Sequence, residues 1–520
     1  MTISPPLGLL AVILLVIGAF LAFGRPGRRP ALVPYAAEAA AGMSVMLAVA
    51  GVVQFAVLGP GTFTIGNGPF AIGFRLDPIS AVMTALVAFV GWIVVRYART
   101  YLDGEAREGW FHGLMLATLA AVLLLVQAGT LLVLLAAFIM VGIGLRRLLL
   151  FYPDRAEAQR AATKFTLVWG LGDAALLVAT VGLWIAFGTT DVVALSQAAA
   201  AGMPTVANIA VGFLVLAALL KTAAFPLHGW LTEVMEAPTP VSALLHAGII
   251  NGGGFLLIRL ADVVQASPGA MAALVLLGGL TALFGAVVML TQSAVKTALA
   301  WSTIAQMGFM ILQCGLGLWT LALLHIVAHS LYKAHAFLAS GTAVEAVNAI
   351  RKPGAVAVPG LAAVGRSFAL AIALYGLVAT GFSFFAGAKS TQALALGAML
   401  VFGVAYLVAQ GMADAAPAAL TRRTLTASTG ATVAYFGFQG LAGAWWGAAL
   451  PQPPHPSALE WALIVLAVAS FGIVAFAQAL FPLWAHHPAS AGRRVHIANG
   501  LYLNALLDRL IGGFRTAKPL

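Results

Sequence analysis

The chain has 520 residues, of which 62% are hydrophobic and 8% are charged, with a formal net charge of +11. Soluble domains carry roughly 25% charged residues, so this composition excludes a water-soluble enzyme and an intrinsically disordered chain. Cys314 is the single cysteine, which excludes a disulfide-stapled secreted fold and a cysteine-rich metal cluster within this chain. The sequence therefore predicts an all-α polytopic membrane protein.

Long apolar runs predict about fifteen transmembrane helices. A helix needs about 20 mainly apolar residues to cross a bilayer. Such runs occupy residues 6–23, 36–58, 78–96, 111–127, 129–151, 163–187, 206–235, 240–262, 268–290, 293–314, 317–347, 367–386, 390–413, 427–450 and 458–482. The first run has no basic segment before it, so we interpret it as a span and not as a cleaved signal. We expect a single transmembrane domain over residues 1–482.

A cytoplasmic tail over residues 483–520 is expected to follow the last span. Residues 494–515 within it form a short amphipathic segment. Its leucines fall near one face of a helix: Leu501, Leu503, Leu506, Leu507 and Leu510. This pattern predicts a helix that lies on the membrane surface, against lipid.

The basic residues predict the orientation. With an outside N-terminus and fifteen spans, 22 of the 27 Lys and Arg residues fall in inside loops, and only Arg75 and Lys389 fall outside. Cytoplasmic loops carry an excess of basic residues, so we expect an N-out, C-in protein whose net charge does not indicate nucleic-acid binding. The other three basic residues, Lys221, Arg259 and Lys333, fall within spans. Arg259 lies near the outer end of its span, where its side chain is expected to snorkel.

Lys221 and Asp173 are the first candidate ion-handling residues. Lys221 follows about fifteen apolar residues, and Pro226 after it predicts a helix break. Broken helices in a membrane free backbone groups that ion-handling proteins use. Asp173 lies in the middle of the sixth span without a partner nearby in sequence, so Lys221 is its natural partner. The alternatives are a snorkelling or structural lysine and a neutral structural aspartate.

Two histidines and two glutamates flank this break. His228 follows it, and His246 lies about six residues into the next span. Histidine is the side chain best placed to change charge near neutral pH, so both are candidate proton-relay residues, with a hydrogen-bonded structural histidine as the alternative. Glu233 and Glu236 are expected near the inner surface, either as a proton entry or as part of a solvated loop.

A second polar cluster lies in the run 317–347. His325, His329 and Lys333 are spaced by four residues and form one stripe along a helix. Such stripes seldom face lipid, which favours a proton or water chain. Two histidines at this spacing can share a zinc ion, but Lys333 would repel the cation and no third ligand lies nearby. We therefore expect no metal and no cofactor in this chain.

Ser302, Thr303 and Gln306 in the preceding run either extend this hydrated line or hold helices together. No phosphate-binding loop, nucleotide fingerprint or catalytic triad stands out, and we interpret the isolated Ser242 as a packing residue. The sequence thus favours a transporter subunit over an enzyme.

These motifs resemble the antiporter-like membrane subunits shared by respiratory complex I and multisubunit sodium/proton antiporters. The resemblance covers roughly residues 70–345, and its most specific segments are PTPVSALLHAG at 238–248 and HSLYKAHAFLASG at 329–341. It implies two inverted five-helix repeats, here about 111–262 and 268–413, each with a broken helix. It also implies a central proton axis with one acidic position: Lys221, His246, His325, His329 and Lys333, with Asp173.

The chain departs from the complex I subunits in its fifth span. That span reads TLLVLLAAFIMVGIGLRRLLLFY and has no acid, with Phe138 and Ile139 near the place of the expected glutamate. The second repeat offers Lys389 only at the end of its span.

Four segments are more similar to the DabB-type subunits of the DAB inorganic-carbon pump. They are GLRRLLLFYPDRAEAQRAATKF at 144–165, the segment 227–254, KSTQALALGAMLVFGVAYLVAQG at 389–411 and HIANGLYLNALLDRL at 496–510. This resemblance implies a proton- or sodium-conducting subunit in a bacterial inner membrane. It would couple the cation gradient to CO2 or bicarbonate uptake by a large DabA-like partner that resembles β-carbonic anhydrase and holds zinc. The alternatives are a subunit of a complex I-type or Mrp-type antiporter complex and a non-conducting anchor for a soluble enzyme.

Overall fold

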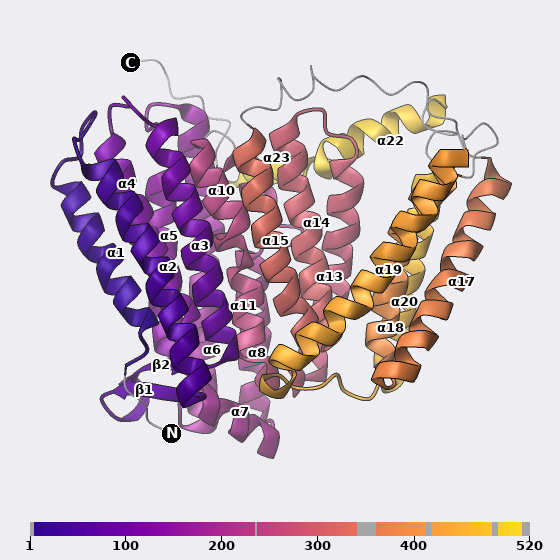
Figure 1. The fold of residues 1–520 in the computed structure, drawn as a ribbon, viewed down its shortest axis with the longest axis horizontal. Helices are drawn as coiled ribbons and strands as arrows, with labels where there is room; N and C mark the ends of the chain where they lie inside the picture. Colours follow the sequence, from indigo (N-terminus) through magenta and orange to yellow (C-terminus); the bar gives the residue numbers. More distant parts are fainter. Residues whose placement is uncertain (1–4, 235–236, 341–359, 412–417, 481–486, 512–520) are drawn as a thin grey trace.

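The computed structural model describes residues 5–234, 237–340, 360–411, 418–480 and 487–511, and this part of the chain is mostly helical. Long helices stand side by side, and the short helices α22 (Pro488–Ala498) and α23 (Leu503–Ile511) lie across one end of them (Figure 1). Among the described helices, eleven are long and apolar enough to span a membrane. The expectation of a helical multi-pass membrane protein is confirmed, while the fifteen crossings, the repeats, the domain bounds and the orientation stay predictions.

The first six helices pack against one another in the amino-terminal part of the molecule. They are α1 (Gly8–Phe23), α2 (Val33–Leu58), α3 (Pro78–Tyr101), α4 (Glu108–Val126), α5 (Leu131–Leu149) and α6 (Ala156–Phe187). Between α2 and α3, β1 (Gly61–Ile65) and β2 (Ile72–Leu76) form an antiparallel hairpin around η1 (Gly68–Phe70). Phe63 and Phe74 lie opposite each other in its register and stack, which fixes the pairing of the two strands.

The next two predicted spans are interrupted. The first comprises α8 (Thr205–Lys221) and α9 (Gly229–Glu233), and the short α7 (Val192–Ala201) precedes it. As Pro226 predicts, the helix does not continue through residues 222–228, and Ala223 takes a positive φ of 51° there.

The second interrupted span is a difference from the sequence analysis, which treated residues 240–262 as one helix. It divides into α10 (Thr239–Ala247), η3 (Ile249–Asn251), α11 (Gly252–Arg259) and α12 (Ala261–Gln265). Gly248 has φ −122° and ψ −77°, outside the helical region, and ends α10. Gly253 in α11 packs closely against α8, because a Cβ at this position would lie 2.3 Å from the Ala218 carbonyl oxygen.

The remaining long helices form the carboxy-terminal part. They are α13 (Pro268–Met289), α14 (Val295–Gly315), α15 (Trp319–Ala339), α17 (Leu361–Ala386), α18 (Thr391–Gly411), α19 (Ala418–Trp446) and α20 (Ala458–Ala479). Helices α13 and α14 approach closely, since a Cβ at Gly308 would lie 2.3 Å from the Ala282 nitrogen. Small residues at such contacts are typical of membrane helices, whose association depends on close packing. Helix α20 contacts α13, and α19 contacts α15, which joins α17–α20 to the rest (Figure 1).

The predicted amphipathic segment forms two helices instead of one, because Leu501 and Tyr502 in η6 (Gly500–Tyr502) have positive φ values. In α23, Leu506 and Leu510 are exposed while Asp508 is buried. The polar face therefore packs on the protein and the leucines point away from it. Contact of these leucines with lipid stays a prediction, and residues 512–515 lie outside the described residues.

A buried ion cluster holds the start of α3. Asp77 caps this helix by accepting a hydrogen bond from the Ser80 amide at 2.7 Å. Arg259 donates to Asp77 at 2.7 Å and to the Val126 carbonyl at 3.1 Å, and Arg75 lies 2.6 Å from the same carboxylate. The expectation that Arg259 snorkels is wrong, because its side chain is 1% exposed and finds its partner inside the protein.

The cluster keeps Asp77 ionised. Burial alone would raise the pKa of its carboxyl, but Arg259, Arg75 and the Ser80 hydrogen bonds outweigh burial and hold the pKa below its ordinary value. The resulting stabilisation is present above the ordinary pKa of an aspartate and is lost as pH falls through the lowered value.

Replacing Arg259 with leucine should lower the free energy of unfolding by about 3–5 kcal/mol, because the Asp77 carboxylate then stays buried without its inner cation. Thermal unfolding in detergent measures the loss. Arg75→Leu is the matched control, since it removes the partly exposed cation of the same carboxylate and should cost about 1 kcal/mol or less. Equal losses in the two variants would contradict the dominance of the buried pair.

Candidate functional site

The structure brings Lys221 and Asp173 together. Lys221 is the last residue of α8 and is fully buried, and its ammonium donates to Asp173 Oδ1 of α6 at 2.6 Å. The same ammonium lies 4.2 Å from the ring centre of Trp169 and 4.5 Å from that of Phe138. A desolvated cation is attracted to aromatic faces, so two rings and one carboxylate together hold this charge.

Helix α5 contributes an aromatic ring to Lys221 where complex I subunits are expected to contribute a glutamate. Phe138 is fully buried on α5, and its carbonyl accepts a hydrogen bond from the Trp169 indole at 3.2 Å. The acidic partner of Lys221 therefore comes from α6, 48 residues earlier in the chain.

His246 belongs to a second polar group. Its Nδ1 lies 3.1 Å from Thr303 Oγ1 of α14, and its ring stacks on Phe337 of α15 at 4.2 Å. The Thr303 hydroxyl donates to the Leu299 carbonyl at 3.0 Å, so it accepts from His246 and Nδ1 carries a proton. Among the described residues, His246 Nε2 has no hydrogen-bond partner.

Lys333 of α15 joins the same group. Its ammonium is buried and donates to the Leu299 carbonyl at 3.1 Å and to Ser302 Oγ at 2.9 Å. The Leu299 carbonyl thus connects Lys333 with Thr303 and His246. Gln306 donates to Ser302 at 3.3 Å and extends the line along α14. In the part of the chain that the structure describes, no carboxylate forms an ion pair with Lys333.

The histidine stripe of α15 continues from Lys333. The rings of His325 and His329 lie 6.0 Å apart, and His325 Nδ1 is 2.9 Å from Gln313 Oε1 of α14. His329 is buried, and neither of its ring nitrogens has a partner among the described residues. Two buried ring nitrogens without partners would be costly in a dry site.

His228 occupies a different environment. Its ring packs against Phe225, Phe284 and Trp301, with centroids 6.1, 5.4 and 5.0 Å away. Its Nδ1 has no hydrogen-bond partner among the described residues, so the hydrogen-bonded structural alternative is not shown and a relay role for His228 stays a prediction.

Glu233 belongs to a buried network at the end of the helices where α23 lies. Lys164 of α6 is fully buried and binds the Glu233 carboxylate, Asn504 Oδ1 at 2.8 Å and the Asp508 carboxylate at 2.5 Å. Asn504 also donates to Glu233 at 2.6 Å, while Arg160 lies 3.6 Å from it. The solvated-loop alternative for Glu233 is therefore wrong, and Glu236 lies outside the described residues.

The sequence analysis missed this network, because it counted Lys164 among the basic residues of an inside loop. Two signals were present. Lys164 lies on the same helix as Asp173, about 13 Å along its axis. Asn504 and Asp508 are four residues apart on α23, the tail helix, so they share one face of it.

Comparisons with known proteins identify the family of this chain. Residues 128–415 match the family model described as NADH:quinone oxidoreductase/Mrp antiporter, TM, and residues 63–112 match that of complex I chain 5 N-terminus. The chain is 36% identical over 472 residues to a Halothiobacillus neapolitanus protein named probable inorganic carbon transporter subunit DabB2, covering 88% of this chain and 83% of that protein.

Two further similarities agree with these. A Hydrogenovibrio crunogenus protein named probable inorganic carbon transporter subunit DabB is 44% identical over 285 residues, which cover 54% of this chain and about half, 55%, of that protein. The fold is similar to a chain of the Mrp complex from Dietzia sp. DQ12-45-1b, with a TM-score of 0.67 and 23% identity, covering 97% of this chain and 59% of that one.

Replacing Lys164 with methionine should release the tail helix. The change leaves the carboxylates of Glu233 and Asp508 without their shared cation, at a cost of about 3–5 kcal/mol. We expect trypsin to cleave at Arg509 about tenfold faster, because local opening exposes the backbone. Time courses on gels measure this rate.

Arg160→Met is the matched control, since Arg160 is on the same helix and reaches the same Glu233 from a partly exposed position. It should leave the tail protected. A Lys164→Met protein cleaved no faster than wild type would show that other contacts hold α23.

Proposed function

This chain belongs to the NADH:quinone oxidoreductase/Mrp antiporter family, in its DabB-type branch, and from that premise we propose that it is the cation-conducting membrane subunit of an inorganic carbon transporter. In this role the chain lets protons, or sodium ions, move down their gradient and couples that movement to CO2 or bicarbonate uptake. The chemistry of hydration belongs to a partner, and the chain itself needs no cofactor.

The observation that carries this proposal is the buried Lys221–Asp173 pair, at 2.6 Å, together with the buried Lys333. Charged side chains are expensive inside a membrane, and they mark ion pathways by default. A lysine needed only for packing would be replaced at less cost by an apolar side chain. The histidines of α10 and α15 beside these charges favour protons as the conducted ion.

The coupling works through changes of pairing. Separation of Lys221 from Asp173 leaves two buried charges without compensation. Transfer of the Lys221 proton towards His246 moves the positive charge from Lys221 to His246, and reprotonation of Lys221 restores the pair with Asp173. Each elementary charge that crosses the membrane supplies about 2.3 kcal/mol per 100 mV, which suffices to bias a hydration step that is near equilibrium.

We further propose that the soluble partner is a large DabA-like zinc protein and that the complex lies in a bacterial inner membrane. Support comes from the relatives, which are named as subunits, so their names imply a complex of more than one chain.

Lys221→Ala should abolish inorganic carbon uptake while leaving assembly intact. The change removes the Lys221 ammonium, which exchanges partners in the proposed cycle. We therefore expect the flux of protons or sodium ions in proteoliposomes to fall about a hundredfold or more, as for loss of an essential proton-transfer group. Arg366→Ala on the exposed side of α17 is the matched control and should keep full flux. Assembled Lys221→Ala complex with wild-type uptake would overturn the proposal.

Purification of the chain from its host in mild detergent, with zinc analysis, tests the partner. We expect a stoichiometric, large soluble protein that carries zinc. Copurifying quinone- or flavin-binding subunits would instead identify a respiratory complex, and recovery of antiporter subunits alone would identify an Mrp-type complex.

A further inference from the structure

The polar residues of the candidate path fall into two groups that the helix break between α10 and α11 separates. One contains Lys221 and Asp173, and the other contains His246 and Lys333. Asn251, the last residue of η3, lies at this break and is 2% exposed. The sequence analysis gave this asparagine no role.

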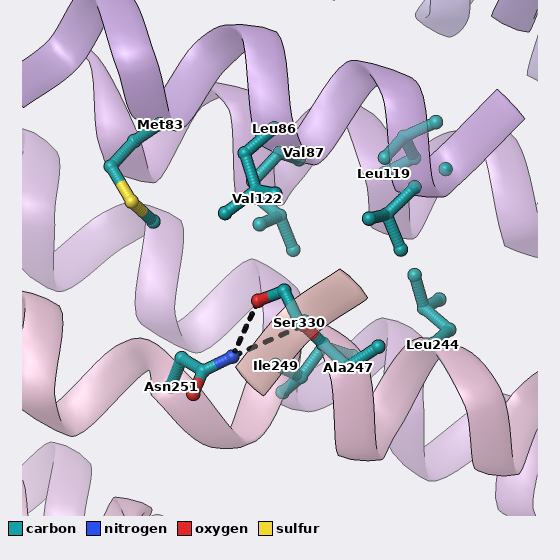
Figure 2. A pocket seen from close by; sticks show the side chains of 13 residues that line it. Met83, Leu86, Val87, Leu119, Val122, Leu244, Ala247, Ile249, Asn251 and Ser330 are labelled. Carbon is teal, nitrogen blue, oxygen red and sulfur yellow. Dashed lines mark hydrogen bonds between the residues drawn. The ribbon is translucent and has the colours of Figure 1, made fainter. Parts of the chain in front are cut away.

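Hydrogen bonds fix how the Asn251 amide is turned. Its Nδ2 donates to the Ala247 carbonyl and to Ser330 Oγ of α15, each at 3.1 Å (Figure 2). A carbonyl only accepts, so the nitrogen must face Ala247 and the amide cannot be flipped. Both amide hydrogens are thus used, while Oδ1 is buried without a donor among the described residues. A buried amide oxygen normally has a partner, either from the protein or from an ordered water.

Two small cavities border Asn251, and each has a volume of about 20 Å³. One reaches Ser330, as Figure 2 shows, and the other reaches Phe138 and Trp169. Their remaining lining is mostly apolar, so Asn251 is the polar side chain that the two cavities share. A space of about 10–15 Å³ holds one water molecule if polar partners are present.

We propose that Asn251 and Ser330 bind an ordered water molecule at this break, and that this water joins the Lys221 group to the group of His246 and Lys333. Asn251 Oδ1 accepts one hydrogen of the water, and Ser330 Oγ fixes the amide from the opposite helix. The site takes water because its volume excludes anything larger.

One cavity extends towards the Lys221 group, and the other extends towards α15, which carries Lys333. Phe138 and Trp169 carry the ammonium of Lys221 on their ring faces. Ser330 lies three residues before Lys333, on the same face of α15. A proton that leaves the Lys221 ammonium adds to the water oxygen, and the water releases another of its protons to Nε2 of His246, which has no hydrogen-bond partner among the described residues. Lys221 becomes a neutral amine, His246 becomes an imidazolium, the water is regenerated, and the total charge is unchanged.

This inference rests on the proposed function, because the linking water matters only in a conducting protein. Asn251→Leu tests it in the purified complex, reconstituted into liposomes with an internal pH dye. Leucine has a similar size but offers no amide, so we expect proton flux to fall roughly tenfold or more. Asn251→Ser keeps a hydrogen-bonding oxygen and leaves room for water, so it should restore most of the flux.

Asn208→Leu is the matched control, because Asn208 is exposed on α8 and makes only local hydrogen bonds. A high-resolution density map of the wild-type complex supplies an independent readout, namely density for water within hydrogen-bonding distance of Asn251 Oδ1. Full flux in Asn251→Leu, or no such density, would overturn the inference while leaving the proposed function intact. Absence of flux in the wild type and in Asn208→Leu would instead refute the proposed function itself.

Discussion

The ammonium of Lys221 lies deep among apolar helices, and much of the surrounding architecture compensates for that buried charge. Asp173 supplies the opposite charge at 2.6 Å, and Trp169 and Phe138 cover the ammonium with their rings. These three partners come from α5 and α6, so one cation links α8 to both helices. An unpaired lysine here would destabilise the fold, and under the proposed function the exchange of its partners accompanies proton movement.

Two helix breaks, after Lys221 and at Gly248, lie close in sequence to the polar residues of the candidate path. Helix α8 ends at Lys221, and helical structure does not resume until α9 starts at Gly229. The break at Gly248 similarly turns Asn251 towards Ser330 of α15. Continuous helices would bond every backbone group internally and would leave a dry, apolar wall between the two groups of polar residues. Interrupted helices are therefore the means by which polar groups become available within a packed apolar interior.

Buried ion pairs also hold both ends of the helical core. Arg259 ties α11 to the start of α3 through Asp77, and Lys164 ties α6 to α9 and to the tail helix through Glu233 and Asp508. Each cation has its partners fixed by several hydrogen bonds, in contrast to Lys333, which binds only neutral groups among the described residues. The ends of the core are thus pinned, while the middle holds charges whose pairing is less constrained.

The sequence by itself determined that the chain is a helical multi-pass membrane protein with a break near Pro226, because apolar length and proline chemistry are local properties. It also predicted the residues of the axis from their helical spacing and from the family resemblance, and their role in conduction stays a prediction. It indicated that Asp173 and Lys221 would pair, since two opposite charges within one membrane must find each other. It did not determine the partners of Arg259 and Lys164, which lie 182 residues and up to 344 residues away along the chain. Nor did it reveal the break at Gly248 or the place of Asn251 between two cavities. Those features depend on which helix faces meet, and only the packing of distant segments decides that.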